Sequence, residues 1–259
     1  MPETPELPSV PVGKIKSILF SQPKPESEKS PFYELARKFN LKVDFRPFIQ
    51  VAPVEAKDFR KSRLNIADFK SVVFNSRNSI DHYFRLCEEM RVDISPDTRY
   101  FCISENVGVY IQKYVILRKR KIYFGQGKIS DLFAVMARFK SEPFMLPCSD
   151  VMEGDFVAEA AGVGLDMRQA IMYRTISSDL SDLSDIKYDM LVFFSPQGIK
   201  SLFENFPDFV QENTRIAGFG ARTHAAITEH GLRLDIAAPN PDFPSMSAAI
   251  EDYIKKFSR

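Results

Sequence analysis

Residues 72–84 (VVFNSRNSIDHYF) are repeated in outline at residues 191–203 (LVFFSPQGIKSLF). Each copy begins with an apolar run of strand length, continues with a serine in a turn, and ends in a pattern typical of an amphipathic helix. Ser76 in the first copy corresponds to Ser195 in the second. A weak internal duplication of this kind predicts two related lobes.

The same alternation extends outward from both copies. Residues 98–104 correspond to residues 214–220, and each segment is followed within about two residues by a helical pattern. Short apolar strands that alternate with amphipathic helices predict parallel sheets covered on both faces. The expected fold class is therefore α/β, with two similar flavodoxin-like lobes. The extended run at residues 41–51 contains Pro47 and is closed by Pro53, which predicts an edge strand or a connector between lobes.

Two related lobes imply a cleft between them. Parallel sheets bind ligands at the carboxyl ends of their strands, where helix N-termini present free N–H groups. We expect four turns at the lip of this cleft: residues 76–78, 104–107, 195–198 and 220–223. The serines in these turns can also be explained as helix N-caps, and the two roles are compatible.

Composition limits the classes of partner. The formal net charge is +1, so no overall field attracts nucleic acid or a membrane, and an anionic ligand must be bound by local donors. The three cysteines have no metal-site spacing and are expected to be buried, apolar and reduced, as in the cytoplasm. Residues 1–13 are proline-rich and predict a disordered lead-in. No apolar run approaches the roughly 18 residues of a membrane helix, so the expected protein is soluble.

Familiar cofactor motifs are missing or incomplete. Residues 218–223 (GFGART) begin like a dinucleotide-binding turn, but Thr223 stands where the third glycine is needed. There is no phosphate-binding lysine loop, and the three histidines, at positions 82, 224 and 230, are scattered and expected on helix surfaces. The basic run at residues 113–121 is expected to be a solvated helix end and loop. No metal site or cofactor is predicted.

Six short segments, in this order and spacing, resemble the uroporphyrinogen-III synthase family over nearly the whole chain. They are VVFNSRNSI (72–80), FMLPCSD (144–150), AIMYRT (170–175), LVFFSPQGI (191–199), IAGFGARTHAAITEHGL (216–232) and the Pro244-Ser245 pair that opens the last helix. The resemblance implies a discontinuous first lobe, residues 14–47 with 176–259, and a second lobe, residues 54–168. Hinge strands at residues 48–53 and 169–175 would join them around the cleft, and the lobes would move relative to each other.

The resemblance also implies a reaction. The family closes the linear tetrapyrrole hydroxymethylbilane into a ring and inverts ring D, in haem biosynthesis. Loss of the terminal hydroxyl gives a cationic azafulvene, and a spiro intermediate follows. Tyr173 in the MYRT segment matches the family's candidate general acid. It can also be explained as a packing aromatic with a satisfied hydroxyl.

The resemblance places substrate-binding residues at the helix N-termini and identifies no cofactor. Ser76, Ser195 and Thr223 match family positions that face the substrate. With their neighbours in the same turns, the predicted substrate-binding residues are Ser76, Arg77, Asn78, Ser195, Gln197, Gly198, Arg222 and Thr223. Three positions in the middle lobe depart from the family, namely Asn75 in place of threonine, Val107 in place of threonine, and Cys148 in place of arginine. Two alternatives therefore stay open, a non-catalytic tetrapyrrole- or anion-binding descendant and a nucleotide-dependent flavodoxin-like enzyme. The family further suggests a monomer, while the cysteines and the low net charge predict a cytoplasmic protein without nucleic-acid partners.

Overall fold

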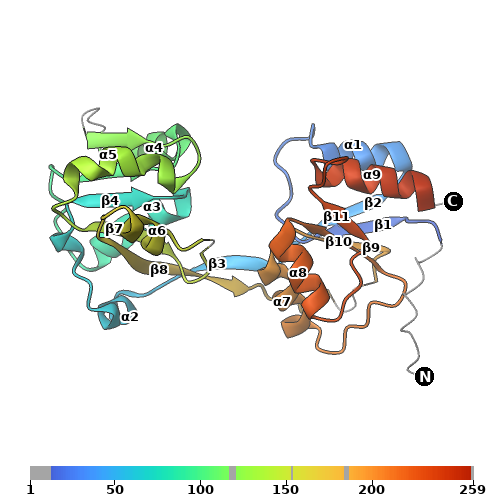
Figure 1. The fold of residues 1–259 in the computed structure, drawn as a ribbon. Helices are drawn as coiled ribbons and strands as arrows, with labels where there is room; N and C mark the ends of the chain where they lie inside the picture. The colour runs from blue at the N-terminus through green and yellow to red at the C-terminus, as the bar shows by residue number, and fades with distance from the viewer. Residues whose placement is uncertain (1–12, 117–120, 153, 184–186, 258–259) are drawn as a thin grey trace, which may run out of the picture. The chain divides into compact units, whose positions relative to one another are not determined.

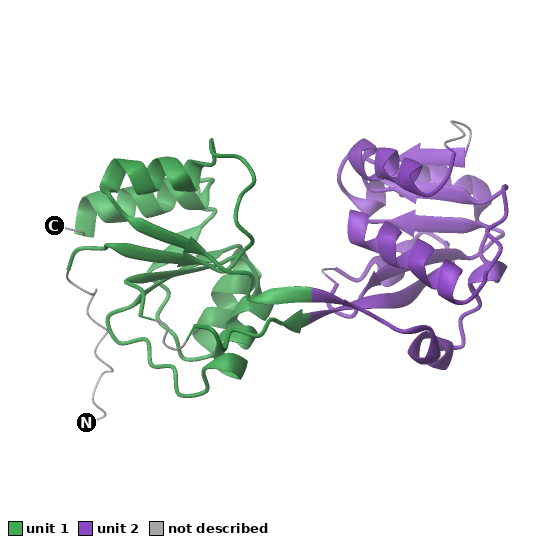
Figure 2. Ribbon diagram, turned by 180° about the vertical axis from the view of Figure 1, so that it is seen from behind, with its two compact units in different colours: residues 1–50, 176–259 green, residues 51–175 purple. Residues whose placement is uncertain are grey.

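The computed structural model describes residues 13–116, 121–152, 154–183 and 187–257. Two predicted segments extend outside these ranges. They are the expected disordered lead-in, of which residues 1–12 lie outside, and the basic run at residues 113–121, of which residues 117–120 lie outside. The chain divides into two compact units, residues 1–50 with 176–259 and residues 51–175 (Figure 2). It passes between them within two strands that are neighbours in one sheet, β3 (Ile49–Pro53) and β8 (Met167–Ser177). The exact lobe and hinge boundaries expected from the resemblance remain a prediction.

Unit 1 is built on a five-stranded parallel sheet with the order β11-β10-β9-β1-β2 (Figure 1). Its strands are β1 (Ser17–Phe20), β2 (Lys42–Phe45), β9 (Met190–Phe193), β10 (Arg215–Phe219) and β11 (Ile236–Ala238). Numbered within the unit, this is the 2-1-3-4-5 order of flavodoxin. Its switch point lies between β1 and β9.

Both faces of this sheet are covered because successive strand residues point to opposite sides. Ile18 and Phe20 of β1 pack beneath α1 (Pro31–Phe39) and α9 (Met246–Phe257). Leu19, between them, packs with α7 (Pro196–Asn205) and α8 (Ala221–Glu229). Continuous apolar strands are the sequence signature of such a doubly covered sheet.

Unit 2 contains a six-stranded sheet with the order β3-β8-β7-β4-β5-β6. Its remaining strands are β4 (Ser71–Phe74), β5 (Arg99–Cys102), β6 (Ile122–Phe124) and β7 (Phe144–Ser149). Each strand pair whose register is described runs parallel in both units, which confirms the α/β prediction. Apart from the added strand β3, the strand order in unit 2 is 3-2-1-4-5, as in the dinucleotide-binding fold. The two units therefore differ in strand order, and unit 1 is the one with the order of flavodoxin.

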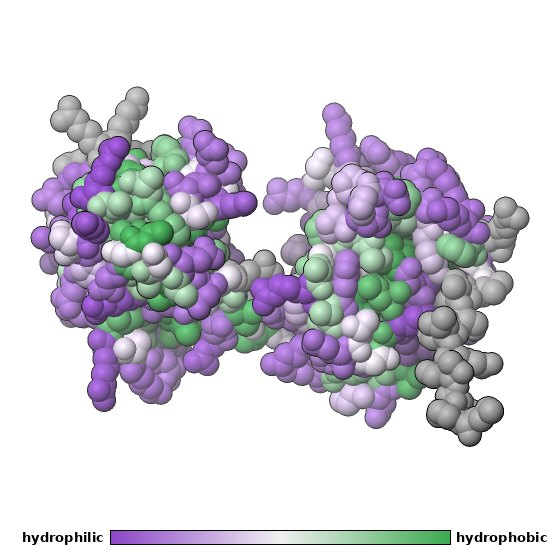
Figure 3. Space-filling view, in the orientation of Figure 1, coloured by the Kyte–Doolittle hydropathy of each residue, from purple (hydrophilic) through white to green (hydrophobic). Residues whose placement is uncertain are grey.

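One face of the unit 2 sheet packs against α3 (Arg77–Glu89), and the other packs against α5 (Phe133–Met136) and α6 (Phe156–Gly162). The shorter helices and turns are α2 (Ala56–Phe59), α4 (Glu105–Tyr110), η1 (Arg60–Ser62), η2 (Ile66–Asp68), η3 (Ile111–Lys113), η5 (Ile129–Leu132) and η6 (Ala137–Phe139). Hydrophilic side chains cover much of the visible face of each unit, with hydrophobic patches between them (Figure 3).

Several local predictions can be compared with the structure. The three cysteines are free and buried, as expected. The proline-marked strand β3 lies at a sheet edge, which confirms that expectation. The helical pattern expected shortly after residues 98–104 forms α4, which begins at Glu105 and continues as the 3-10 turn η3. Strand β11 begins at Ile236, and Arg233 and Asp235 form an ion pair just before it.

Candidate functional site

Three helices begin directly after strands with a serine cap. The side-chain oxygen of Ser76 accepts a hydrogen bond from the Ser79 N–H at 3.1 Å, and the Ser79 hydroxyl accepts one from the Ser76 N–H at 3.2 Å. Ser195 accepts from the Gly198 N–H at 3.3 Å in the duplicated copy, and Ser104 caps α4 in the same way. The serines are therefore N-caps, and the remaining N–H groups of the first turns face the carboxyl edges of the sheets.

Tyr173 reaches this edge in unit 2 because of a register shift between β7 and β8. Cys148 pairs with Ile171, but the next residue of β7, Ser149, pairs with Tyr173. Two consecutive residues of β8, Met172 and Tyr173, are consequently both buried against the α3 face. A bulge of this type re-aims a side chain at the end of a strand.

The Tyr173 side chain contacts α3 at two points. Its hydroxyl lies 3.3 Å from the Ser76 hydroxyl at the N-cap, and its ring stacks on His82 with centroids 4.9 Å apart. The tyrosine is only 6% exposed. Burial raises the pKa of Tyr173, although its hydrogen bond with Ser76 opposes this change, so the phenol keeps its proton at neutral pH.

Two residues at this site were missed by the sequence analysis. His82 is half-buried against Tyr173 rather than lying on a helix surface, and its Nδ1 accepts a hydrogen bond from Arg85 Nε at 3.3 Å. Arg85 also donates to the carbonyl of Val54 at 2.7 Å and to that of Met172 at 3.3 Å. The three-residue spacing of the His–Arg pair was the only sequence signal, and it predicts neighbours on a helix without indicating what they contact.

The other histidines also correct the surface prediction in part. His224 is half-buried, and its Nε2 lies 2.8 Å from the Gly218 carbonyl and 3.1 Å from the Ala238 carbonyl. His230 is exposed at the end of α8, where its ring stacks on Phe203.

In unit 1 the predicted residues lie on two neighbouring helices, α7 and α8. Ser195, Gln197 and Gly198 form the cap and first turn of α7. Gly198 is buried, and a Cβ built on it would lie 3.6 Å from the hydroxyl of Ser21, which follows β1. Hydroxyls from both sides of the switch point therefore lie at the start of α7. This is the edge where open α/β sheets bind ligands.

The start of α8 is different because its N-cap, Gly220, has no side chain with which to cap the helix. Gly220 has a φ of +88°, a conformation that favours glycine. Arg222 is exposed in the first turn, whereas Thr223 is 2% exposed. The N–H groups of this turn receive no side-chain cap from Gly220, so this helix start is suited to an anion.

The structure thus groups the predicted residues within each unit. Ser76, Arg77, Asn78 and Tyr173 lie together around the start of α3 in unit 2, and the other five lie on α7 and α8 in unit 1. Arg77 is exposed, and its guanidinium lies over the ring of Tyr110 at 5.2 Å.

The three positions at which the resemblance led us to expect other residues, Asn75, Val107 and Cys148, occupy different environments. The Asn75 side-chain oxygen is buried and accepts no hydrogen bond within the described residues. Val107 contributes its N–H to Ser104 at 3.4 Å. Cys148 is fully buried among the apolar side chains on the α5 and α6 face, and burial raises the pKa of its thiol to about 11.

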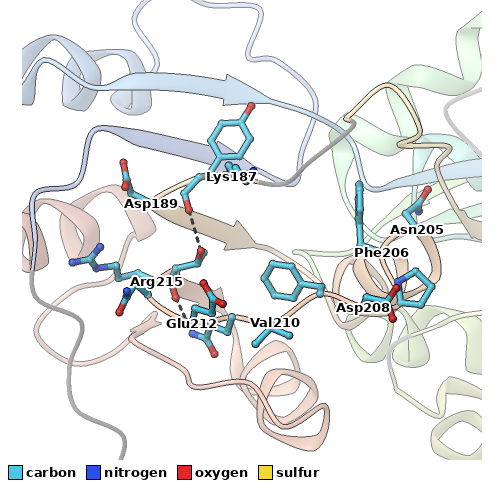
Figure 4. A pocket seen from close by; sticks show the side chains of 14 residues that line it. Lys187, Asp189, Asn205, Phe206, Asp208, Val210, Glu212 and Arg215 are labelled. Atoms are coloured by element: carbon cyan, nitrogen blue, oxygen red, sulfur yellow. Dashed lines mark hydrogen bonds between the residues drawn. The ribbon is translucent and has the colours of Figure 1, made fainter.

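A cavity of about 840 Å³ lies at the opposite edge of the unit 1 sheet (Figure 4). It is lined by residues 187–189 and 205–215, which precede or begin β9 and β10. Because these are the amino ends of the strands, the cavity is separate from the predicted site. Within the described ranges, no group of three or more His, Cys, Asp or Glu side chains could hold a metal ion, and no helix is long and apolar enough to cross a membrane.

Fold and strand ends together define an α/β protein with two sets of N–H and hydroxyl donors suited to an anionic ligand. The family model described as uroporphyrinogen-III synthase HemD matches residues 30–248. The chain therefore belongs to the uroporphyrinogen-III synthase family, whose members are lyases of tetrapyrrole synthesis.

Solved structures support the fold. The structure of uroporphyrinogen-III synthetase from Helicobacter pylori is 16% identical, with 93% of this chain and 99% of that chain covered and a TM-score of 0.59. A mutant uroporphyrinogen III synthase from Thermus thermophilus is 13% identical, with 93% and 98% covered and a TM-score of 0.51. Among curated proteins, none matches the sequence.

Proposed function

We propose that this chain converts hydroxymethylbilane into uroporphyrinogen III, with Tyr173 as the general acid. The family match over residues 30–248 supports the reaction. The observation that supports the acid is the position of the Tyr173 hydroxyl, 3.3 Å from the N-cap hydroxyl of the helix that follows β4. A protonated phenol at the ligand-binding edge of a parallel sheet has a proton available for a leaving group.

The first chemical step is the loss of the terminal hydroxyl of hydroxymethylbilane. Tyr173 transfers its proton to that hydroxyl, and the carbon–oxygen bond breaks. Water departs, and the remaining substrate is an azafulvene cation. The substituted carbon of ring D attacks this cation to form the spiro intermediate, which reopens and recloses. Loss of a proton from the closed ring restores the phenol, so the overall change is the loss of one water molecule.

Substrate binding relies on local donors because the chain has almost no net charge. In unit 2, the first turn of α3 supplies Ser76, Arg77 and Asn78. In unit 1, α7 and α8 supply the remaining five residues: Ser195, Gln197, Gly198, Arg222 and Thr223. Free N–H groups at helix starts and the Arg77 and Arg222 guanidinium groups bind the substrate carboxylates.

The enzyme's main task is to select one geometry of closure. Spontaneous closure gives isomer I, so the bound substrate must be held where ring D is inverted. We further propose that the reaction needs no cofactor and that the protein acts as a cytoplasmic monomer without nucleic-acid partners.

The test supplies freshly made hydroxymethylbilane to the pure protein without added metal, flavin or nicotinamide. Oxidised products are then separated by isomer. Isomer III in excess of isomer I supports the proposal. If isomer I alone forms while the protein still binds uroporphyrinogen, the non-catalytic alternative is correct.

A further inference from the structure

The ring of Tyr173 lies between two fixed points on one helix. At one point its hydroxyl meets the Ser76 hydroxyl at the start of α3, and at the other its face lies on the His82 imidazole. The two rings are nearly parallel, with an interplanar angle of 20°. Ser76 constrains the end of the phenol, whereas His82 constrains the plane of its ring.

His82 is itself held in place by Arg85. The Arg85 Nε donates to His82 Nδ1, so this imidazole nitrogen is an acceptor and the ring is neutral, with its proton on Nε2. The same guanidinium donates to the carbonyl of Met172, the residue before Tyr173, and pairs with Glu89 at 2.6 Å. Arg85 therefore fixes both the imidazole and the strand that carries Tyr173.

We propose that His82 is a positioning residue for Tyr173 and that its neutral imidazole holds the phenol in the orientation needed for proton transfer. This role rests on the acid function proposed for Tyr173. Displacement of a reacting group by about 1 Å can reduce turnover by as much as 10²-fold, so fixing the ring plane has a measurable effect.

The arrangement is sensitive to acid. Protonated His82 would have donors on both nitrogens and could no longer accept the Arg85 hydrogen bond. The charged groups near the imidazole are Asp81 and Arg85 on its own helix, and β8 contributes Tyr173. Burial, with a smaller effect from Arg85, lowers the pKa of His82 below 6.5, while Asp81 opposes this change. The stacked arrangement should therefore be intact at neutral pH and lost as the pH falls through this lowered value.

Four variants test the proposal by formation of isomer III. His82→Ala removes the stacked ring, and kcat should fall about tenfold with KM changed less than about twofold. His82→Phe keeps a stacked ring without a titrating nitrogen, and its kcat at pH 7.5 should stay within about threefold of wild type. His230→Ala is the matched control because His230 also stacks on an aromatic ring, that of Phe203, and should leave kcat unchanged. Adding His82→Ala to Tyr173→Phe should cause no further loss.

The pH dependence separates positioning from a purely structural role. The ratio of wild-type kcat to His82→Phe kcat should decrease as the pH falls from 7.5 to 5.5. Each of four outcomes would overturn the proposal. They are a constant ratio, an unchanged kcat in His82→Ala, equal losses of kcat in His82→Ala and His82→Phe, and a further loss of kcat when His82→Ala is added to Tyr173→Phe. Thermal unfolding confirms that each variant is folded.

A spectroscopic measurement distinguishes this failure from failure of the proposed function. In protein with carbon-13 in its tyrosine rings, the Tyr173 signal is assigned by its loss in Tyr173→Phe. It should shift through the histidine pH range in wild type and stay constant in His82→Phe, and a signal that is constant in both overturns the contact. Wild-type turnover in Tyr173→Phe would show instead that the acid assignment is wrong, and the positioning role would be rejected with it.

Discussion

Replacing Tyr173 with phenylalanine is the most direct test of the chemistry, because the structure allows the costs to activity and to stability to be separated. The hydroxyl has one hydrogen bond in the described residues, at 3.3 Å to Ser76. Its loss should destabilise the protein by about 1 kcal/mol or less, since the buried ring keeps its stacking on His82. Loss of a general acid should reduce kcat by about 10²–10⁴-fold, or roughly 2.7–5.4 kcal/mol in the activation barrier.

The assay compares the rate of isomer III formation at pH 7.5 with the rate of spontaneous isomer I formation in the same mixture. Tyr100→Phe is the matched control, because Tyr100 is also 6% exposed and packs in the same core cluster. It should keep wild-type turnover. Isomer III formed by Tyr173→Phe at the wild-type rate, with the expected small change in unfolding temperature, would refute the assignment of Tyr173 as the acid.

Three further outcomes follow from other contacts. Ser195→Ala should destabilise α7 by about 1 kcal/mol and raise KM, whereas Asp155→Ala, which removes the cap of α6, should affect stability alone. Urea unfolding and KM measurements check both variants, and an unchanged KM in Ser195→Ala would show that Ser195 does not bind substrate. Cys148→Arg would bury a charge in the apolar cluster on the α5 and α6 face and should abolish folding, so a soluble variant with wild-type unfolding temperature would contradict the packing described. Burial tends to raise the pKa of Asp81, but hydrogen bonds from Tyr114, Lys113 and Tyr110 lower this pKa overall. The stability that Asp81 contributes is present above its ordinary unfolded pKa of about 4 and is lost as the pH falls through the lowered value. Asp81→Asn should therefore flatten the fall of unfolding temperature with acid, and parallel curves for the variant and wild type would count against this network.

Local signals in the sequence predicted the parts of the site that depend on local structure. The serines at positions 76 and 195 follow buried strands, and both cap helices as their sequence context indicates. The alternation of apolar strands and amphipathic helices correctly predicted parallel sheets, because each strand had to be buried on both faces.

Long-range geometry explains what the sequence did not predict. Strand order within unit 2 depends on which neighbour each strand finds, and the local pattern is the same for the orders 2-1-3-4-5 and 3-2-1-4-5. The register shift that pairs Ser149 with Tyr173 depends on a partner residue 24 positions away in the sequence, and nothing in the MYRT segment marks it. His82 meets Tyr173 only after that shift, so its contact could not be deduced from the spacing on α3.

The same shift explains why a departure such as Cys148 is compatible with the proposed function. Cys148 lies before the shift, in register with Ile171, and its side chain packs into the core on the α5 and α6 face. Ser149, the next residue, is in register with Tyr173, and its hydroxyl lies 3.1 Å from that of Thr175. Cysteine at position 148, where the resemblance led us to expect arginine, therefore affects core packing on the face away from α3. The acid and its contacts with the helix lie on the other face, where this substitution leaves them in place.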